Sequence, residues 1–357
     1  MTGRDRVIRT LEFNNPDRVP RDLWWLPAVE MFREDELLKL LNEFPMDIDY
    51  PDFAPGSSEV QRQSNLPNFT VYGLENPTVG SYIDEWGSIW NVREDGVIGE
   101  VKDPVLKDLG RIDALQPPWD FLETTDLTAV DRQCRESDKF MISGITARPF
   151  ERLQFLRGTE SLYKDLIKNK SEIMEVRDIV HRYHLAHIEK WLETEVDALW
   201  LMDDWGGQDN LLIPPDIWRE FFKPLYKEYC DIIHDAGKYV FFHSDGCIEK
   251  VFEDVVEVGI DAVNSQLFTM DLQMIADSVK GKITFWGEID RQYLLPFGDP
   301  HEVKEGVQEV RSFLDGANGG LIAQCEWGKN DPAENVRAVF EAWAEPYLKA
   351  EELTSNL

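Results

Sequence analysis

The second half of this sequence alternates between short apolar runs and longer segments with helical periodicity. The apolar runs lie at residues 140–145, 198–202, 239–242, 262–263, 283–286 and 321–323. Two clear helical segments lie between them, at about 171–195 and at 214–236, where a proline pair precedes the helix and a glycine follows it. Strands that alternate with helices of this length form βαβ units around a parallel sheet. About six such units favour a (β/α)8 barrel of the TIM type.

A doubly wound sheet is the alternative α/β architecture. Such sheets often bind dinucleotides through a glycine-rich turn that directly follows a strand. No turn of that kind follows any of the apolar runs. The barrel is therefore the preferred prediction.

The first 120 residues are less regular than the rest. A helix is expected at 4–13 and a strand at 22–26, whereas residues 45–120 are rich in Pro, Gly and Asn. This stretch contains Asp84-Glu85-Trp86-Gly87, and we expect it to form a cap over the barrel mouth. We interpret residues 1–357 as one barrel domain in which about the first 120 carry an N-terminal helix and the cap insertions.

The composition excludes several classes of protein. A formal net charge of −31 argues against binding to nucleic acid or to anionic membranes, because no basic stripe is present. No apolar run of about 18 residues occurs, and the start lacks the apolar core of a signal peptide, so a cytoplasmic location is expected. Four cysteines in so long a chain are expected to be free thiols or metal ligands.

Polar side chains follow the apolar runs at the points where the predicted strands end. They are Asp203 and Asp204, His243 and Asp245, Gln266, Glu288, and Cys325. The carboxyl ends of parallel strands in a barrel meet at one mouth, where active sites lie. Since His, Cys, Asp and Glu are the ligand types of zinc, the set predicts a zinc site there. Each residue taken alone could equally be a hydrogen-bonded polar group at a barrel end.

Two cysteines compete for the role of sulfur ligand. Cys247 lies four residues after His243, whereas Cys325 ends a predicted strand. We favour Cys325, because Cys247 is expected to open the next helix. Whether Asp245 or Cys247 completes the site beside His243 stays open at this point. A hydrolytic serine elbow and a strand-end lysine for Schiff-base chemistry are both absent from the sequence.

Several short motifs resemble those of one known superfamily. The chain resembles the uroporphyrinogen decarboxylase superfamily over nearly its whole length, and within it the cobalamin-linked methyltransferases. The motifs are Pro16-Asp17-Arg18-Val19-Pro20, Asp84-Glu85-Trp86-Gly87, Asp203-Asp204-Trp205-Gly206-Gly207-Gln208, Phe221-Phe222-Lys223-Pro224, Phe242-His243-Ser244-Asp245-Gly246, Gly287-Glu288-Ile289-Asp290 and Cys325.

The amino-terminal segment departs from the decarboxylase branch. Decarboxylases carry an arginine-rich stretch there that holds the carboxylates of the porphyrinogen. Residues 18–25 read Arg-Val-Pro-Arg-Asp-Leu-Trp-Trp in this chain and lack that arginine pair. Decarboxylation of a tetrapyrrole is therefore not expected.

The resemblance to the methyltransferases implies a zinc site with one substitution. Those members bind zinc through His-x-Cys after one strand and a Cys after a later one, and His243 and Cys325 match two of these positions. Asp245 stands where the first Cys is expected. A carboxylate gives a harder zinc than a thiolate, which suits the oxygen of a methyl ether. Glu288 would complete the metal site or donate a proton.

The resemblance thus implies a zinc-dependent O-demethylase that moves a methyl group from a methoxylated aromatic compound to the cobalamin of a partner corrinoid protein. Glu288 and Asp204 are the expected catalytic carboxylates. Two alternatives remain open, namely transfer from a methylated corrinoid protein to a thiol or tetrahydrofolate, and a ligand-binding barrel without catalysis. Members of the superfamily occur as monomers or homodimers. Residues expected to line the substrate pocket are Asp203, Gln208, Gln266, Trp86 and Trp205.

Overall fold

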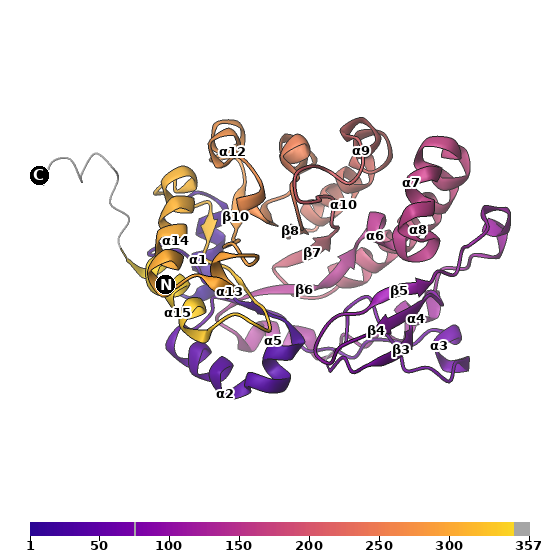
Figure 1. The fold of residues 1–357 in the computed structure, drawn as a ribbon, viewed down its shortest axis with the longest axis horizontal. Coiled ribbons are helices and arrows are strands. Elements are labelled where there is room, and N and C mark those ends of the chain that lie inside the picture. The colour runs from indigo at the N-terminus through magenta and orange to yellow at the C-terminus, as the bar shows by residue number, and fades with distance from the viewer. Residues whose placement is uncertain (75, 346–357) are drawn as a thin grey trace, which may run out of the picture.

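The computed structural model describes residues 1–74 and 76–345 and has an α/β fold (Figure 1). Its central element is a curled sheet of parallel strands. Seven strands follow the order β11-β10-β9-β8-β7-β6-β2, and β1 pairs in parallel with β12. The strands are β1 (Trp24–Trp25), β2 (Ile48–Asp49), β6 (Phe140–Ala147), β7 (Ala198–Met202), β8 (Tyr239–Ser244), β9 (Ala262–Ser265), β10 (Thr284–Trp286), β11 (Leu321–Ile322) and β12 (Glu326–Trp327).

Backbone hydrogen bonds on both sides of β1 close the sheet into a barrel. Asp22 N donates to Ala323 O at 2.9 Å, which links β1 to the segment between β11 and β12. On the other side, Asp47 N donates to Arg21 O at 2.9 Å, which links β1 to β2. The predicted TIM-type barrel is therefore confirmed.

Helices cover the outside of the barrel (Figure 1). The prediction of a helix at 171–195 is confirmed by α8. The second predicted helix, at 214–236, is instead two helices that meet at Phe222, because Pro224 has no N–H to donate to the carbonyl of residue 220. The α-helices are α1 (Gly3–Leu11), α2 (Pro27–Glu43), α3 (Glu59–Gln63), α4 (Trp119–Thr124), α5 (Val130–Glu136), α6 (Pro149–Arg157), α7 (Thr159–Lys168), α8 (Lys170–Leu192), α9 (Pro215–Phe221), α10 (Lys223–Asp235), α11 (Phe252–Val258), α12 (Leu272–Val279), α13 (Leu294–Phe297), α14 (Pro300–Leu314) and α15 (Ala333–Ala344). Three 3₁₀ helices, η1 (Leu109–Ala114), η2 (Glu249–Val251) and η3 (Leu267–Thr269), complete the set in the described ranges.

Side chains on the strands alternate between two hydrophobic layers, as the pleat of a β-strand requires. One layer fills the inside of the barrel, where Val7 and Leu11 of α1 pack against side chains such as Phe140, Phe241 and Trp286. The other layer lies between the strands and the surrounding helices. A residue's place in this alternation therefore decides whether it faces the interior of the barrel.

The N-terminal insertion contains an antiparallel sheet of three strands, β3 (Gly80–Ile83), β4 (Ile89–Val92) and β5 (Glu100–Asp103), which lies beside the barrel (Figure 1). Asp84 holds the β3–β4 turn by accepting hydrogen bonds from the backbone N–H groups of Trp86 and Ser88. Arg152 on α6 then ties this turn to the barrel, with contacts of 2.9 Å to Asp84 and 2.6 Å to Glu85. The Asp-Glu-Trp-Gly motif is thus the anchor of the insertion.

We expect Arg152→Met to destabilise the protein by about 3–5 kcal/mol, because it leaves two buried carboxylates without their cation. Both partners and Arg152 itself are almost fully buried. Arg135→Met is the matched control, since it removes an exposed pair with Glu195 and should cost less than about 1 kcal/mol. Denaturant unfolding of the two variants measures the difference, and equal losses would contradict the anchoring role.

In the part of the chain that the structure describes, no helix has the combination of length and apolar character needed to span a bilayer.

Candidate metal centre and its cavity

Three side chains from two neighbouring strands converge at the carboxyl end of the barrel. Asp204 follows β7, His243 lies near the end of β8, and Asp245 comes two residues later. His243 Nε2 lies 3.5 Å from Asp204 Oδ1 and 3.4 Å from Asp245 Oδ1. One ligand atom from each residue lies within 4.8 Å of the other two. Within the described residues this is the group whose donor atoms are placed to hold a metal ion.

Asn264 on β9 fixes the orientation of the His243 ring. The two side chains are joined by a 2.6 Å hydrogen bond between His243 Nδ1 and Asn264 Oδ1. The amide group of Asn264 is itself fixed, because its Nδ2 donates to Trp286 O at 2.6 Å and to Gln324 Oε1 at 2.9 Å. Asn264 Oδ1 must then accept, so His243 Nδ1 carries the hydrogen and Nε2 faces the two carboxylates. Metal-binding histidines are commonly oriented in this way.

The charges of this group suit a cation. Burial alone would lower the pKa of His243, but Asp204 and Asp245 outweigh it and raise that pKa to about 10. Burial would raise the pKa of Asp204, but His243 outweighs burial and lowers the pKa of this carboxyl. The pair of carboxylates therefore holds a positive charge at Nε2. One imidazole nitrogen and two carboxylates are also a donor set that fits a divalent ion such as zinc.

Arg291 is a site residue that the sequence analysis missed. Its guanidinium contacts the carboxylates of Asp245 and Glu326, and its Nε lies 3.2 Å from Glu288 Oε1. Burial raises the pKa of Glu288 to about 8, so this carboxyl keeps its proton at neutral pH. Arg291 follows Glu288 by three residues in the segment after β10, and this i, i+3 spacing was the available signal.

Cys325, which was expected as a zinc ligand, lies outside the Asp204–His243–Asp245 group. Ile322 faces the inside of the barrel and Glu326 borders its cavities. In the alternation of side chains along this segment, Cys325 lies on the face opposite to Ile322 and Glu326. Its side chain is fully buried in the layer between strands and helices. Burial there raises the pKa of the Cys325 thiol. Cys247 is buried too and likewise lies outside the group of donor atoms.

Asp203 is placed away from the cavities that the metal group borders. Its two carboxylate oxygens accept hydrogen bonds from the backbone N–H groups of Phe150 and Glu151, at 2.9 and 2.8 Å, and one also accepts from the hydroxyl of Tyr226. These contacts fix the start of α6 against the end of β7. The structure therefore separates Asp203 from Asp204, although the two are adjacent in the sequence.

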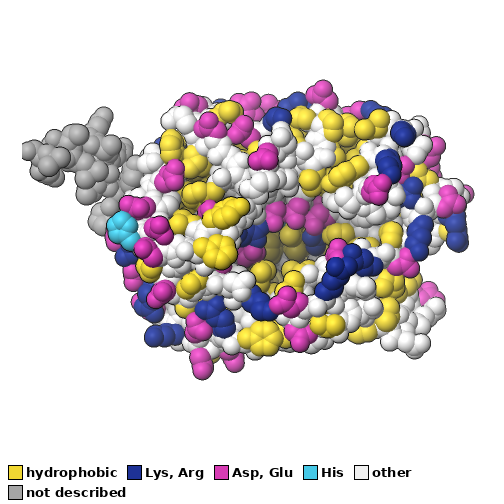
Figure 2. Space-filling model, viewed as in Figure 1, with side chains coloured by type: hydrophobic (Ala, Val, Ile, Leu, Met, Phe, Trp, Pro, Cys, Tyr) yellow, Lys and Arg dark blue, Asp and Glu magenta, His cyan; other side chains and the backbone are white. Residues whose placement is uncertain are grey.

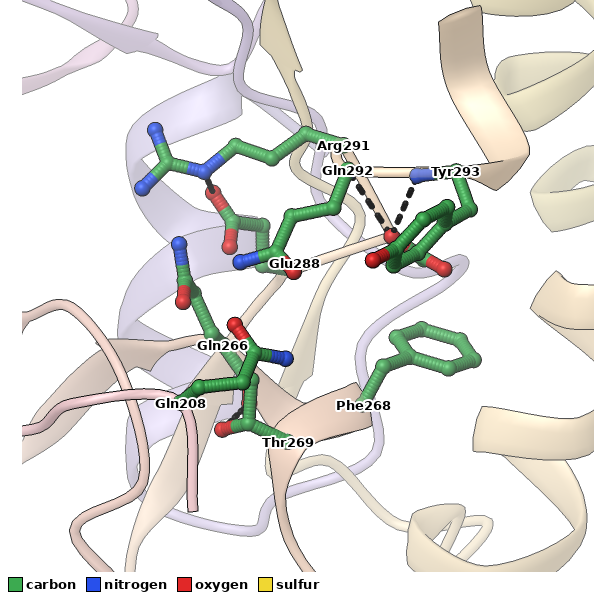
Figure 3. Close-up of a pocket in the computed structure, with 9 residues that line it drawn as sticks. Gln208, Gln266, Phe268, Thr269, Glu288, Arg291, Gln292 and Tyr293 are labelled. Carbon is green, nitrogen blue, oxygen red and sulfur yellow. Dashed lines mark hydrogen bonds and ion pairs between the residues drawn. The ribbon is translucent and has the colours of Figure 1, made fainter. Parts of the chain in front are cut away.

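The expected substrate-binding residues are divided among three places. Gln208, Gln266 and Glu288 line a small cavity of about 60 Å³ beside Arg291 (Figure 3). Trp205 is buried in an aromatic cluster, with its ring 4.2 Å from that of Phe150. Trp86 belongs to the anchor of the insertion and borders a different cavity. Of this set only the small-cavity residues lie near the metal group.

Two larger cavities meet at His243 and Glu326, which border both of them. The apolar lobe, of about 450 Å³, is defined by Trp24, Trp25, Tyr50 and Trp200. The polar lobe, of about 530 Å³, is defined by Arg148, Glu151, Asp204, Asp245 and Arg291, and residues of the insertion also line it. Figure 2 shows a hollow at the centre of the molecule with acidic side chains along one edge. The candidate metal centre thus lies where two chambers join.

Comparisons with known proteins agree with this architecture. A model of the family described as uroporphyrinogen decarboxylase (URO-D) matches residues 87–346. The fold is similar to that of a methyltransferase from Methanosarcina mazei, with a TM-score of 0.70 at 16% sequence identity, over 98% of this chain and 100% of that one.

Dihydropteroate synthases show a more limited likeness. The enzyme from Anaplasma phagocytophilum is 18% identical and has a TM-score of 0.31, over 42% of this chain and 60% of its own, too low to support an argument. No curated protein matches the chain. Since the family model covers most of its length, this chain belongs to the uroporphyrinogen decarboxylase family.

Proposed function

We propose that this protein is a zinc-dependent methyltransferase that moves a methyl group from a methoxylated aromatic compound to the cobalt of a corrinoid protein. The observation that carries the proposal is the position of the Asp204–His243–Asp245 group at the junction of two lobes. A methyl donor and a methyl acceptor must both reach the same centre in such a reaction. The apolar lobe suits an aromatic donor, and the polar lobe leaves room for the acceptor. The similarity in fold to a methyltransferase is consistent with this assignment.

Asp204, His243 and Asp245 would hold the zinc ion, and Asn264 would keep Nε2 of His243 directed at it. When bound, zinc supplies a Lewis acid that draws electrons from the ether oxygen of the substrate. Methyl ethers have poor leaving groups, so activation of the oxygen is the main task of the site. Glu288 borders the small cavity, and its neighbour Arg291 lines both that cavity and the polar lobe. Because burial raises the pKa of Glu288 to about 8, we propose it as the source of the proton for the oxygen that loses its methyl group.

The proposal is tested by mixing the zinc-loaded protein with cob(I)alamin and 2-methoxyphenol and following methylcobalamin by its absorbance. We expect formation of methylcobalamin that stops when the zinc is chelated and resumes when zinc is restored. Zinc-independent formation would contradict the assigned role of the metal. No formation with any methoxylated aromatic compound would contradict the proposed function.

Asp245→Cys tests the argument for a hard metal centre. We expect this variant to keep its zinc, because cysteine is a zinc ligand, and to demethylate ethers about tenfold more slowly, because a thiolate makes zinc a weaker acid toward oxygen. The measurement compares methylcobalamin formation at equal zinc content. An equal or higher rate in the variant would show that the carboxylate at this position is not what activates the ether.

A further inference from the structure

The walls of the apolar lobe are built from aromatic rings in mutual contact. The ring centroids of Trp24 and Trp200 are 5.0 Å apart, and those of Tyr50 and Trp200 are 5.7 Å apart. Trp24 also lies 5.3 Å from the ring of His243, so this wall extends up to the candidate metal centre. Flat rings of this kind pack well against a planar aromatic ligand.

Apart from the candidate metal centre at His243, the described side chains that line the apolar lobe offer no unpaired positive charge to a ligand. Lys139 is the one lysine or arginine among the described residues that line the lobe, and its Nζ pairs with Asp49 Oδ2 at 2.8 Å. Asp22, another residue of the wall, is a buried acid that accepts hydrogen bonds from Tyr50 and Trp286 at 3.0 and 2.9 Å. A carboxylate on the ligand would therefore meet other acids and lose its hydration without gaining a partner.

The cations of the polar lobe are engaged as well. Arg148 pairs with Glu151 at 2.7 Å, and both side chains are largely buried. Arg291 contacts the side chains of three acids, and the carboxylates of two of them, Asp245 and Glu326, line the same lobe. Carboxylates outnumber cations along both lobes, so the arrangement does not compensate a ligand anion in either of them.

From these observations we infer that the methyl donor carries no anionic group, so that it is a methoxyphenol rather than a methoxybenzoate. This inference rests on the proposed function, because the ligand of the apolar lobe is a methyl donor only if the protein transfers methyl groups. Its physical content is the ligand preference of the apolar lobe, which can be measured without any methyl transfer.

Calorimetric titration of the zinc-loaded protein at pH 7.5, without cobalamin, tests this preference. The probes are 2-methoxyphenol and 4-hydroxy-3-methoxybenzoate. We expect the phenol to bind about tenfold more tightly than the benzoate. Equal or tighter binding of the benzoate, or no binding of the phenol, would overturn the inference. Preferred binding of the phenol without subsequent methyl transfer would leave the inference standing and contradict the proposed function.

A charge variant makes the test sharper. Asp49→Asn releases Lys139, and we expect it to tighten binding of the benzoate by about twofold to fivefold, which is the strength of an exposed ion pair. Asp231→Asn is the matched control, because it releases Lys227 from an exposed pair that lines neither lobe, and it should change no affinity. An unchanged benzoate affinity in Asp49→Asn would contradict the claim that Asp49 closes the lobe to anions.

Discussion

His243→Ala is expected to remove bound zinc from this protein and to abolish its methyl transfer. His243 supplies the one nitrogen of the Asp204–His243–Asp245 group, and the remaining two carboxylates come from different strands. Loss of a residue that only supports a metal ligand already costs roughly 10–100-fold in affinity, so loss of the ligand itself should cost more than about 100-fold. Elemental analysis of the purified variant measures the zinc content per chain.

Cys325→Ser provides the control for this experiment. The Cys325 side chain is packed between strands and helices, so its replacement should leave the zinc content unchanged. Thermal unfolding of both variants would show whether each is folded. Retention of zinc in His243→Ala together with its loss in Cys325→Ser would contradict the ligand set described above.

Asn264→Leu is expected to weaken zinc binding by about 10–100-fold while leaving all three ligands in place. The variant removes the acceptor of the 2.6 Å hydrogen bond to His243 Nδ1, so the ring loses both its fixed orientation and its preferred tautomer. Competition with a coloured zinc chelator measures the affinity.

Asn264→Asp is the conservative comparison for this prediction. It keeps a carboxylate oxygen as acceptor for His243 Nδ1 but loses the donations from Nδ2 to Trp286 O and Gln324 Oε1, so it should bind zinc more tightly than Asn264→Leu without reaching the native affinity. Equal weakening in the two variants would mean that Asn264 acts through stability alone, since it is fully buried.

Much of the barrel could be predicted from the sequence, because six of its strands are apolar runs that alternate with helical segments. The six predicted runs correspond to β6 to β11. The strand expected at 22–26 includes β1, whereas β2 covers only Ile48 and Asp49 and is too short to show a periodicity. Closure of the barrel depends on hydrogen bonds of these two short strands, and such pairing cannot be read from a single segment.

The candidate site was only partly predictable. Polar residues that follow an apolar run mark the end of a strand, but they do not show which side chains face the inside of the barrel. The pattern of polar residues after apolar runs predicted that Asp204, His243 and Asp245 lie at one barrel mouth, and the structure brings these three together. The pattern gave no sign that Cys325 lies on the other face, because a shift of one residue in the alternation exchanges the two faces of a strand. Asp203 and Asp204 illustrate the same point, since neighbours on a strand cannot both face the lumen.

The contacts of Asn264 with His243, and of Arg291 with Asp245 and Glu326, join separate strands or loops, and no spacing in the sequence indicates them. Asn264 joins β9 to His243 on β8, and Arg291 joins the segment after β10 to Asp245 and Glu326. These residues orient and neutralise the metal group, so the chemistry of the site depends on pairs that only the fold brings together.

X-ray absorption at the zinc edge of the purified protein tests the proposed metal centre most directly. Bound by Asp204, His243 and Asp245, zinc should show only nitrogen and oxygen neighbours, at about 2.0–2.2 Å. A sulfur neighbour at about 2.3 Å would contradict this ligand set and would return Cys325 or Cys247 to the metal.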